Sequence, residues 1–225
     1  MVRFPERHKV PEFTTFASLL RMTAKYGFSN IREALIEDLK AAYPTKWEDF
    51  EAARILGEDL FGSPKPHPNT VLNLFLEQKI KFALPFAAYR ASLGGFPALV
   101  CDKPGMVIPR LALASIIHGM GKMYRKNVIS AYSIPHSGIP EVCPEESCVL
   151  HARVSSTEER RDALNKLFTC LLGRSDGDML SPLSLGTLAC TNCAKRLEGY
   201  HVGLRKKFIW VELPSLLGWE RWEGV

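Results

Sequence analysis

Four cysteines in the last third of the chain have the residue type and spacing that bind a metal. CPEESC holds Cys143 and Cys148 with four residues between them, and CTNC holds Cys190 and Cys193 with two residues between them. Structural zinc is tetrahedral and often takes four thiolates from two short-spaced pairs. The pattern predicts a structural zinc site at these four positions. A site of three cysteines and His151, and four thiols without a metal, are the alternative interpretations.

The same cysteines favour a closed structural site over a reactive centre. Catalytic zinc keeps one position open for water, usually beside histidine or carboxylate ligands. A redox-active CxxC pair lies in a βαβ unit, which the surrounding sequence does not indicate. The sequence also has no HExxH, no GxSxG and no glycine loop that would cradle a phosphate. We therefore expect a protein that is not an enzyme. An enzyme with an open metal site that has His136, His151 or a carboxylate as a ligand is the third hypothesis.

The final helix is a second candidate for binding chemistry. Apolar residues recur at helical spacing over residues 194–212, directly after Cys190 and Cys193, so we expect this helix to lie against a core. Basic residues that project away from that core could contact phosphates. An ordinary solvated helix face is the alternative interpretation. The five basic residues are Lys195, Arg196, Arg205, Lys206 and Lys207.

Helical patterns dominate the rest of the chain. A first helix is expected to end at Tyr26, where Gly27 breaks it, and helices are again indicated over residues 69–93 and 109–123. Residues 127–156 contain three prolines and no sustained period, which predicts a loop. The residues expected to cap helices are Thr14 or Thr15, Asn30 with Glu33, Thr45 with Glu48, and Ser156 with Glu159.

Strand signals are few, and this decides the expected fold class. Only residues 98–101 and 129–134 have a β-like pattern, and both patterns are short. We therefore predict an all-α, mainly helical protein with a small cysteine-rich, zinc-knuckle-like element. Residues 1–126 should form an N-terminal helical array, and residues 127–225 a C-terminal helical part that carries the CxxxxC and CxxC pairs.

Composition places the chain among ordinary globular proteins. It has 225 residues, of which 46% are hydrophobic and 24% charged, and a formal charge of +5. The first residues are too polar for a signal peptide, and the apolar run Leu111–Ile117 is too short for a membrane helix. We expect an intracellular protein, cytoplasmic or nuclear, whose cysteines are thiols or metal ligands. Cys101 and Cys170 lie in apolar sequence and are expected to be buried.

Four segments carry a resemblance to a known family. They are FASLLRMTAKYGFSNIREALIEDLKAAYPT, LFLEQKIKFALPFAAYRAS, the paired cysteines, and LRKKFIWVELPSLLGWERW. This order resembles the region that follows the BTB/POZ domain in BTB domain-containing proteins of basidiomycete fungi. The resemblance implies that residues 1–126 are a BACK-like, post-BTB array. The chain begins about where the family's BTB domain should end, so we expect either a shortened member of the family or an incomplete gene model, and BTB dimerisation is not carried over.

The expected function follows from apolar helices without a catalytic constellation. We predict a non-enzymatic interaction, scaffold or adaptor module with protein partners, a structural zinc ion, no membrane attachment and no small-molecule substrate. The resemblance implies roles such as ubiquitin-ligase adaptor or transcription regulator, which occur among BTB proteins. The alternative is a zinc-dependent nucleic-acid-binding or transcription-regulatory protein that uses the basic final helix.

Overall fold

The chain is mainly helical, as the sequence predicts. The computed structural model contains no strand among the residues it describes. Neither of the two short β-like patterns forms a strand: residues 98–99 lie in a short helix, and residues 129–134 lie in a long one. The described residues are 12–43, 46–49, 61, 65–138, 158 and 190–219.

The chain divides into two compact units. Residues 1–117 with 217–225 make the first unit, and residues 118–216 make the second. This division and the predicted one after residue 126 both fall inside helix α7 (Arg110–Gly138). Because α7 runs through the boundary between the two units, the helical pattern of the sequence continues across it without a break.

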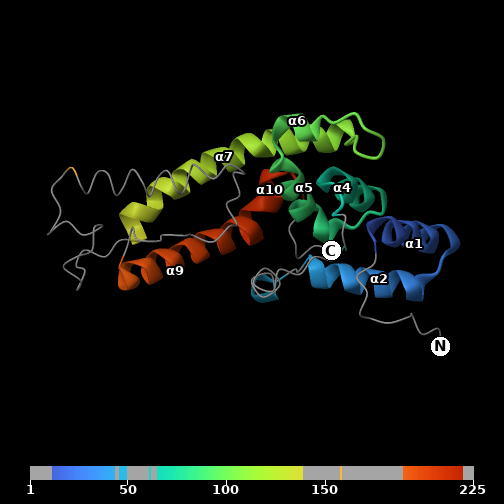
Figure 1. Ribbon diagram of the computed structural model, residues 1–225, viewed down its shortest axis with the longest axis horizontal. Coiled ribbons are helices and arrows are strands. Elements are labelled where there is room, and N and C mark those ends of the chain that lie inside the picture. Colours follow the sequence, from blue (N-terminus) through green and yellow to red (C-terminus); the bar gives the residue numbers. More distant parts are fainter. Residues whose placement is uncertain are drawn as a thin grey trace. The chain divides into compact units, whose positions relative to one another are not determined.

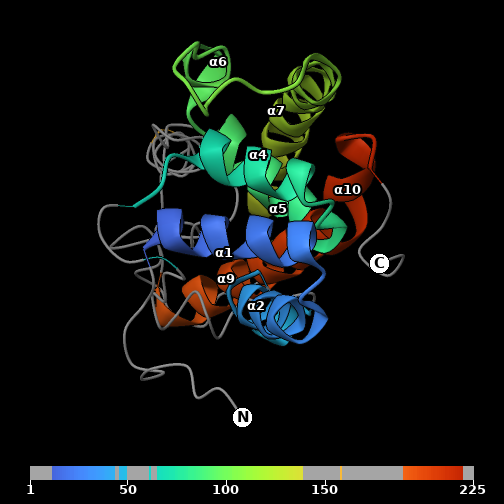
Figure 2. The same cartoon turned by 90° about the vertical axis from the view of Figure 1, so that its right-hand side faces the viewer.

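The first unit begins with two helices joined by a tight turn. Helix α1 (Phe13–Tyr26) ends where predicted, and Gly27 follows it at φ 71°, a left-handed conformation that glycine adopts without strain. Helix α2 (Ser29–Ala42) starts two residues later and packs against α1. Figure 2 shows α1 lying between α2 and the next helices of the unit, α4 and α5.

The predicted side-chain caps of these two helices are wrong. Helix α1 starts one residue before Thr14, with Glu12 at the N-cap position and no side-chain bond there. Helix α2 has Phe28 as its N-cap, because the turn at Gly27 carries the chain directly into the helix and leaves Asn30 inside the first turn. The other two predicted caps, Thr45 with Glu48 and Ser156 with Glu159, each include residues outside the described ones.

The core of the first unit is built on α4 (Pro68–Glu77) and α5 (Leu84–Ser92), which pack together and are joined through the 3₁₀ turn η1 (Lys81–Ala83). His67 caps α4, since its Nδ1 accepts a hydrogen bond from the Asn69 amide at 3.3 Å. Pro68 and Pro85 lie in the first turns of their helices, where a missing N–H costs little.

Two aromatic clusters fill this core. Phe75 of α4 is fully buried and meets Tyr43 edge to face, with ring centroids 5.0 Å apart. Phe13 and Phe16 of α1 meet Phe61 in the same way, at 4.9 and 5.5 Å. The apolar stripe of α1 therefore packs on residues far away in the sequence, as its helical spacing requires.

Helices α6 (Gly95–Leu99) and α7 differ from the prediction. Residues 95–99, which fall between the two predicted helical stretches 69–93 and 109–123, form a short helix. The loop predicted to start at residue 127 is wrong up to residue 138, because α7 continues that far (Figure 1). Pro135 lies inside α7, where it lacks the backbone N–H donor and disfavours the turn before it, yet the helix continues three residues past it to Gly138.

The second unit contains the predicted final helix. Helix α9 (Thr191–Lys207) begins three residues earlier than expected and continues into the π-helical turn η2 (Phe208–Glu212) and α10 (Leu213–Leu216). Its buried stripe is Cys193, Leu197, His201 and Arg205, at intervals of four residues. Lys126 of α7 forms an ion pair with Glu212 of η2 at 3.1 Å, which joins the two helical segments within this unit.

Candidate functional site

The CxxC pair forms the start of α9. Cys190 is the N-cap residue, and its Sγ accepts a hydrogen bond from the Cys193 amide at 3.5 Å, while Cys193 is fully buried. Cys143, Cys148 and the alternative ligand His151 lie outside the described residues. Over the described ranges, no group of three or more histidine, cysteine or acidic residues could hold a metal ion. The structure therefore places one half of the predicted zinc site and leaves the ion itself a prediction.

The basic residues of α9 do not all project from the core. Lys195, Arg196, Lys206 and Lys207 are exposed, whereas Arg205 is only 3% exposed. The expectation that Arg205 projects away is wrong, because it follows His201 by four residues and falls on the buried stripe of the helix. Arg205 has the same charge as Lys206 and Lys207, but its position in the helix places it with the buried residues.

The side of α9 opposite its buried stripe consists of basic residues, glycines and one asparagine. Between its two pairs of basic residues lie Gly199 and Gly203, and a Cβ atom added to either glycine would meet no atom within 4 Å. We call this surface the α9 Lys/Arg–Gly face. Its residues are Asn192, Lys195, Arg196, Gly199, Gly203, Lys206 and Lys207, all exposed.

An exposed apolar surface in the first unit was not predicted from the sequence. Phe96 of α6 and Leu111 of α7 are 56% and 87% exposed, and Val100 and Val107 on the connection between these helices are 45% and 59% exposed. We call these four residues the α6–α7 patch. Their positions, two pairs four residues apart on either side of a Gly- and Pro-containing segment, were the signal that could have identified it.

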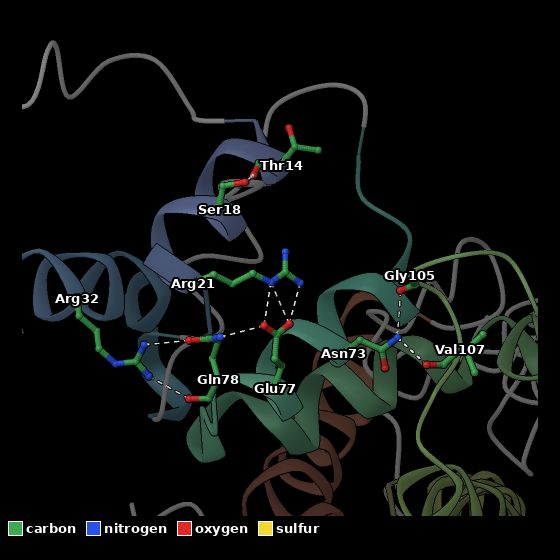
Figure 3. A network of polar contacts seen from close by, with 9 residues as sticks. All are labelled: Thr14, Ser18, Arg21, Arg32, Asn73, Glu77, Gln78, Gly105 and Val107. Carbon is green, nitrogen blue, oxygen red and sulfur yellow. Dashed lines mark hydrogen bonds and ion pairs between the residues drawn. The ribbon is translucent and has the colours of Figure 1, made fainter. Parts of the chain in front are cut away.

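Two asparagines of α4 hold the backbone beneath this patch, and Figure 3 shows the contacts of one of them, Asn73. The Nδ2 of Asn73 donates hydrogen bonds to the carbonyls of Gly105 and Val107 at 3.0 and 2.9 Å. The fully buried Asn69 reaches the same connection: its Nδ2 donates to the carbonyls of Ala98 at 2.7 Å and Met106 at 3.3 Å. Both ends of the α6–α7 connection are thereby fixed to one helix.

A second set of polar contacts fixes α4 to the first two helices (Figure 3). Arg21 of α1 binds both carboxylate oxygens of Glu77, with its Nη2 at 2.8 Å, and Arg32 of α2 donates to the side chain and the carbonyl of Gln78 at 3.1 and 3.0 Å. The hydrogen bonds from Arg21 lower the pKa of the Glu77 carboxyl. Arg21 and Glu77 are about half exposed, so we expect their pair to contribute at most about 1 kcal/mol.

The cysteines outside the predicted site have ordinary surroundings where they are described. Cys101 is half-buried, less than predicted, and its Sγ lies 3.8 Å from the sulfur of Met106. Cys170 lies outside the described residues. Cys101 belongs to the connection under the α6–α7 patch, where a thiol and a thioether pack as small apolar groups.

Comparisons with known proteins identify no relative of this chain. No known protein family, curated protein or solved structure matches the chain. Among the described helices, none combines the length and the apolar character that crossing a membrane requires.

Proposed function

We propose that this protein is a non-enzymatic interaction or scaffold module that binds a protein partner through the α6–α7 patch. The observation that carries this is the exposure of four large apolar side chains on a backbone held by two asparagines. The four exposed residues lie within 16 positions of one another in the sequence, and an apolar surface that they share would be typical of an interaction site, because contiguous exposed apolar surface is uncommon on monomeric proteins. A rigid backbone beneath such a surface lowers the ordering cost of binding.

The partner that suits this patch is an amphipathic helix with acidic residues at the edges of its apolar face. Such a helix binds by placing apolar anchors, three or four residues apart, against an apolar surface, and the patch offers four exposed apolar side chains to receive them. Exposed Lys103 and Arg110 border it, against one exposed acid, Asp102. Charge complementarity therefore favours an acidic segment. Adaptor roles among BTB proteins, which the sequence resembles, are in keeping with this proposal.

The zinc site is proposed as a structural clamp that joins the CPEESC segment to the start of α9. Four thiolates would close the coordination shell, which suits a structural ion and leaves no position for catalysis. Cys190 is half-buried at the N-terminus of α9, and this partial exposure supports its proposed role as a ligand. Its neighbour Cys193 is buried at the next turn, so the pair is held by the helix itself.

We expect one zinc ion per chain, measured by elemental analysis of the purified full-length protein. Cys190→Ser should lower the zinc content and the melting temperature, because it removes a ligand. Serine is a good N-cap residue, so the helix start is preserved and the loss reports on the metal. Cys101→Ser is the matched control and should retain zinc. Protein without stoichiometric metal would end the zinc proposal.

The patch itself is tested with Val107→Asp/Leu111→Asp. This variant should bind less of an apolar fluorescent dye than the wild type at an unchanged melting temperature. Leu111 lies in the first turn of α7, where a carboxylate is favourable with the helix dipole, so the fold should be retained. Met22→Asp, which removes a half-exposed apolar residue from α1, is the control. Equal dye binding by both variants would contradict a specific patch.

A further inference from the structure

We infer that the α9 Lys/Arg–Gly face is a binding site for the phosphate backbone of nucleic acid. Four of its seven exposed residues are cations, and the one acidic residue of α9, Glu198, lies at the edge of the face. The site is independent of the α6–α7 patch, because the two surfaces share no residue and belong to different units of the chain. A failure of one proposal therefore leaves the other standing.

The cations form two pairs at the ends of the face. Lys195 and Arg196 lie eleven residues before Lys206 and Lys207, which is about 16 Å along an α-helix with a rise of 1.5 Å per residue. Lys207 also approaches Glu212 at 3.9 Å but remains 66% exposed, so water screens that pair and the cation can be shared. A partner must therefore offer negative charge at two places separated by about three turns of helix.

The glycines determine what can lie between the two pairs. At Gly199 and Gly203 no side chain projects from the helix, and nothing else in the described structure fills the space within 4 Å of the Cβ positions. The backbone of a partner can therefore approach the axis of α9 closely along the strip formed by Gly199 and Gly203. Glycine costs about 1 kcal/mol relative to alanine in a helix interior, and nothing in the described packing of α9 requires it at either position.

The absence of large apolar groups on this face decides between classes of polyanion. A membrane-surface helix needs large apolar side chains on the face that enters the lipid, and a protein interface usually has aromatic or aliphatic anchors at its centre. None of the seven residues is apolar and large. Binding carried by charge alone is characteristic of phosphate-backbone contacts.

The same composition predicts weak dependence on nucleotide sequence. Asparagine and arginine side chains can read base edges, and the face holds one of each, Asn192 and Arg196. Both precede Gly199, so neither lies between the two cation pairs. Contacts to phosphates position a protein without selecting a sequence. We therefore expect the face to distinguish nucleic acids little by their bases.

The test uses the full-length protein and two probes, a duplex DNA of about 20 base pairs and a single-stranded RNA of about 20 nucleotides. Affinity for at least one probe should fall steeply between about 50 and 200 mM salt. Lys195→Gln/Arg196→Gln and Lys206→Gln/Lys207→Gln should each weaken binding by roughly tenfold or more and flatten the salt dependence. The matched control, Lys79→Gln/Arg90→Gln, removes the same charge from exposed positions of the first unit and should change affinity by less than about twofold.

A third variant tests the close approach without changing charge. Gly199→Leu/Gly203→Leu fills the strip with side chains and also improves helix propensity, so it should melt at the same temperature or higher while binding nucleic acid several-fold more weakly. Wild-type affinity in this variant would overturn the inference. Absence of binding at low salt, or equal loss in the Lys79→Gln/Arg90→Gln control, would also overturn it. Equal or tighter binding to polyglutamate or to anionic vesicles would assign the face to a different partner and contradict nucleic acid.

Discussion

Replacing Phe75 with alanine is expected to lower the free energy of unfolding by about 3–5 kcal/mol, the usual cost of deleting a buried aromatic ring. Phe75 is fully buried in α4, and its ring meets Tyr43 edge to face with centroids 5.0 Å apart. The substitution removes the apolar surface of the ring and leaves a cavity between helices. Urea denaturation of the full-length protein, followed by circular dichroism, measures the change.

Phe96→Ala is the matched control for this prediction. It makes the same chemical change at a side chain that is 56% exposed in α6, so its effect on the free energy of unfolding should stay within about 0.5 kcal/mol. The two variants compare a phenylalanine that is buried in the core, Phe75, with one that is exposed at the surface, Phe96. A loss of several kcal/mol from Phe96→Ala would show that the α6–α7 patch is structural and would contradict its proposed role in binding.

Replacing Asn69 with alanine is expected to cost about 2–4 kcal/mol, because each buried carbonyl that loses its donor costs about 1–3 kcal/mol. The Asn69 Nδ2 donates hydrogen bonds to the carbonyls of Ala98 and Met106 from a fully buried position. The melting temperature measures the total effect. Hydrogen exchange should also show faster opening of residues 100–107, because the substitution releases both ends of this connection.

Asn73→Ala provides the comparison for Asn69→Ala. The Asn73 amide makes the same kind of paired contact, with Gly105 and Val107, but its side chain is only half-buried. Water can replace the lost donor there, so we expect a cost of about 1 kcal/mol or less. If Asn69→Ala were as mild as Asn73→Ala, the connection would be held mainly by packing, and the two asparagines would not explain the rigidity of the patch.

The helices could largely be predicted from the sequence, but their ends could not. The apolar period of α1 and the glycine after Tyr26 are local signals, and both predicted the structure correctly. The caps failed because Gly27 and Phe28 join α1 directly to α2. The α7 extension to Gly138 was missed because three prolines between residues 127 and 156 were interpreted as one irregular stretch, whereas the helix persists through the first of them.

The candidate surfaces depend on helical position and on distant contacts, which composition does not reveal. Arg205 belongs to a basic run but lies on the buried stripe of α9, four residues after His201. The α6–α7 patch was missed because apolar residues are assigned to the core by default, and only the three-dimensional structure shows that Leu111 is 87% exposed. The asparagine contacts join residues far apart in the chain, and no local pattern predicts such pairs.

The most direct test of the α6–α7 patch is a peptide-display selection on the full-length protein. Random peptides of about four helical turns are selected for binding to the wild type and counted again on Val107→Asp/Leu111→Asp and on Met22→Asp. We predict enriched peptides with apolar residues at helical spacing and acidic flanks, which bind the wild type and Met22→Asp and are lost on Val107→Asp/Leu111→Asp. Peptides that bind all three proteins equally, or a selection that enriches no helical apolar pattern, would contradict a docking site at this patch.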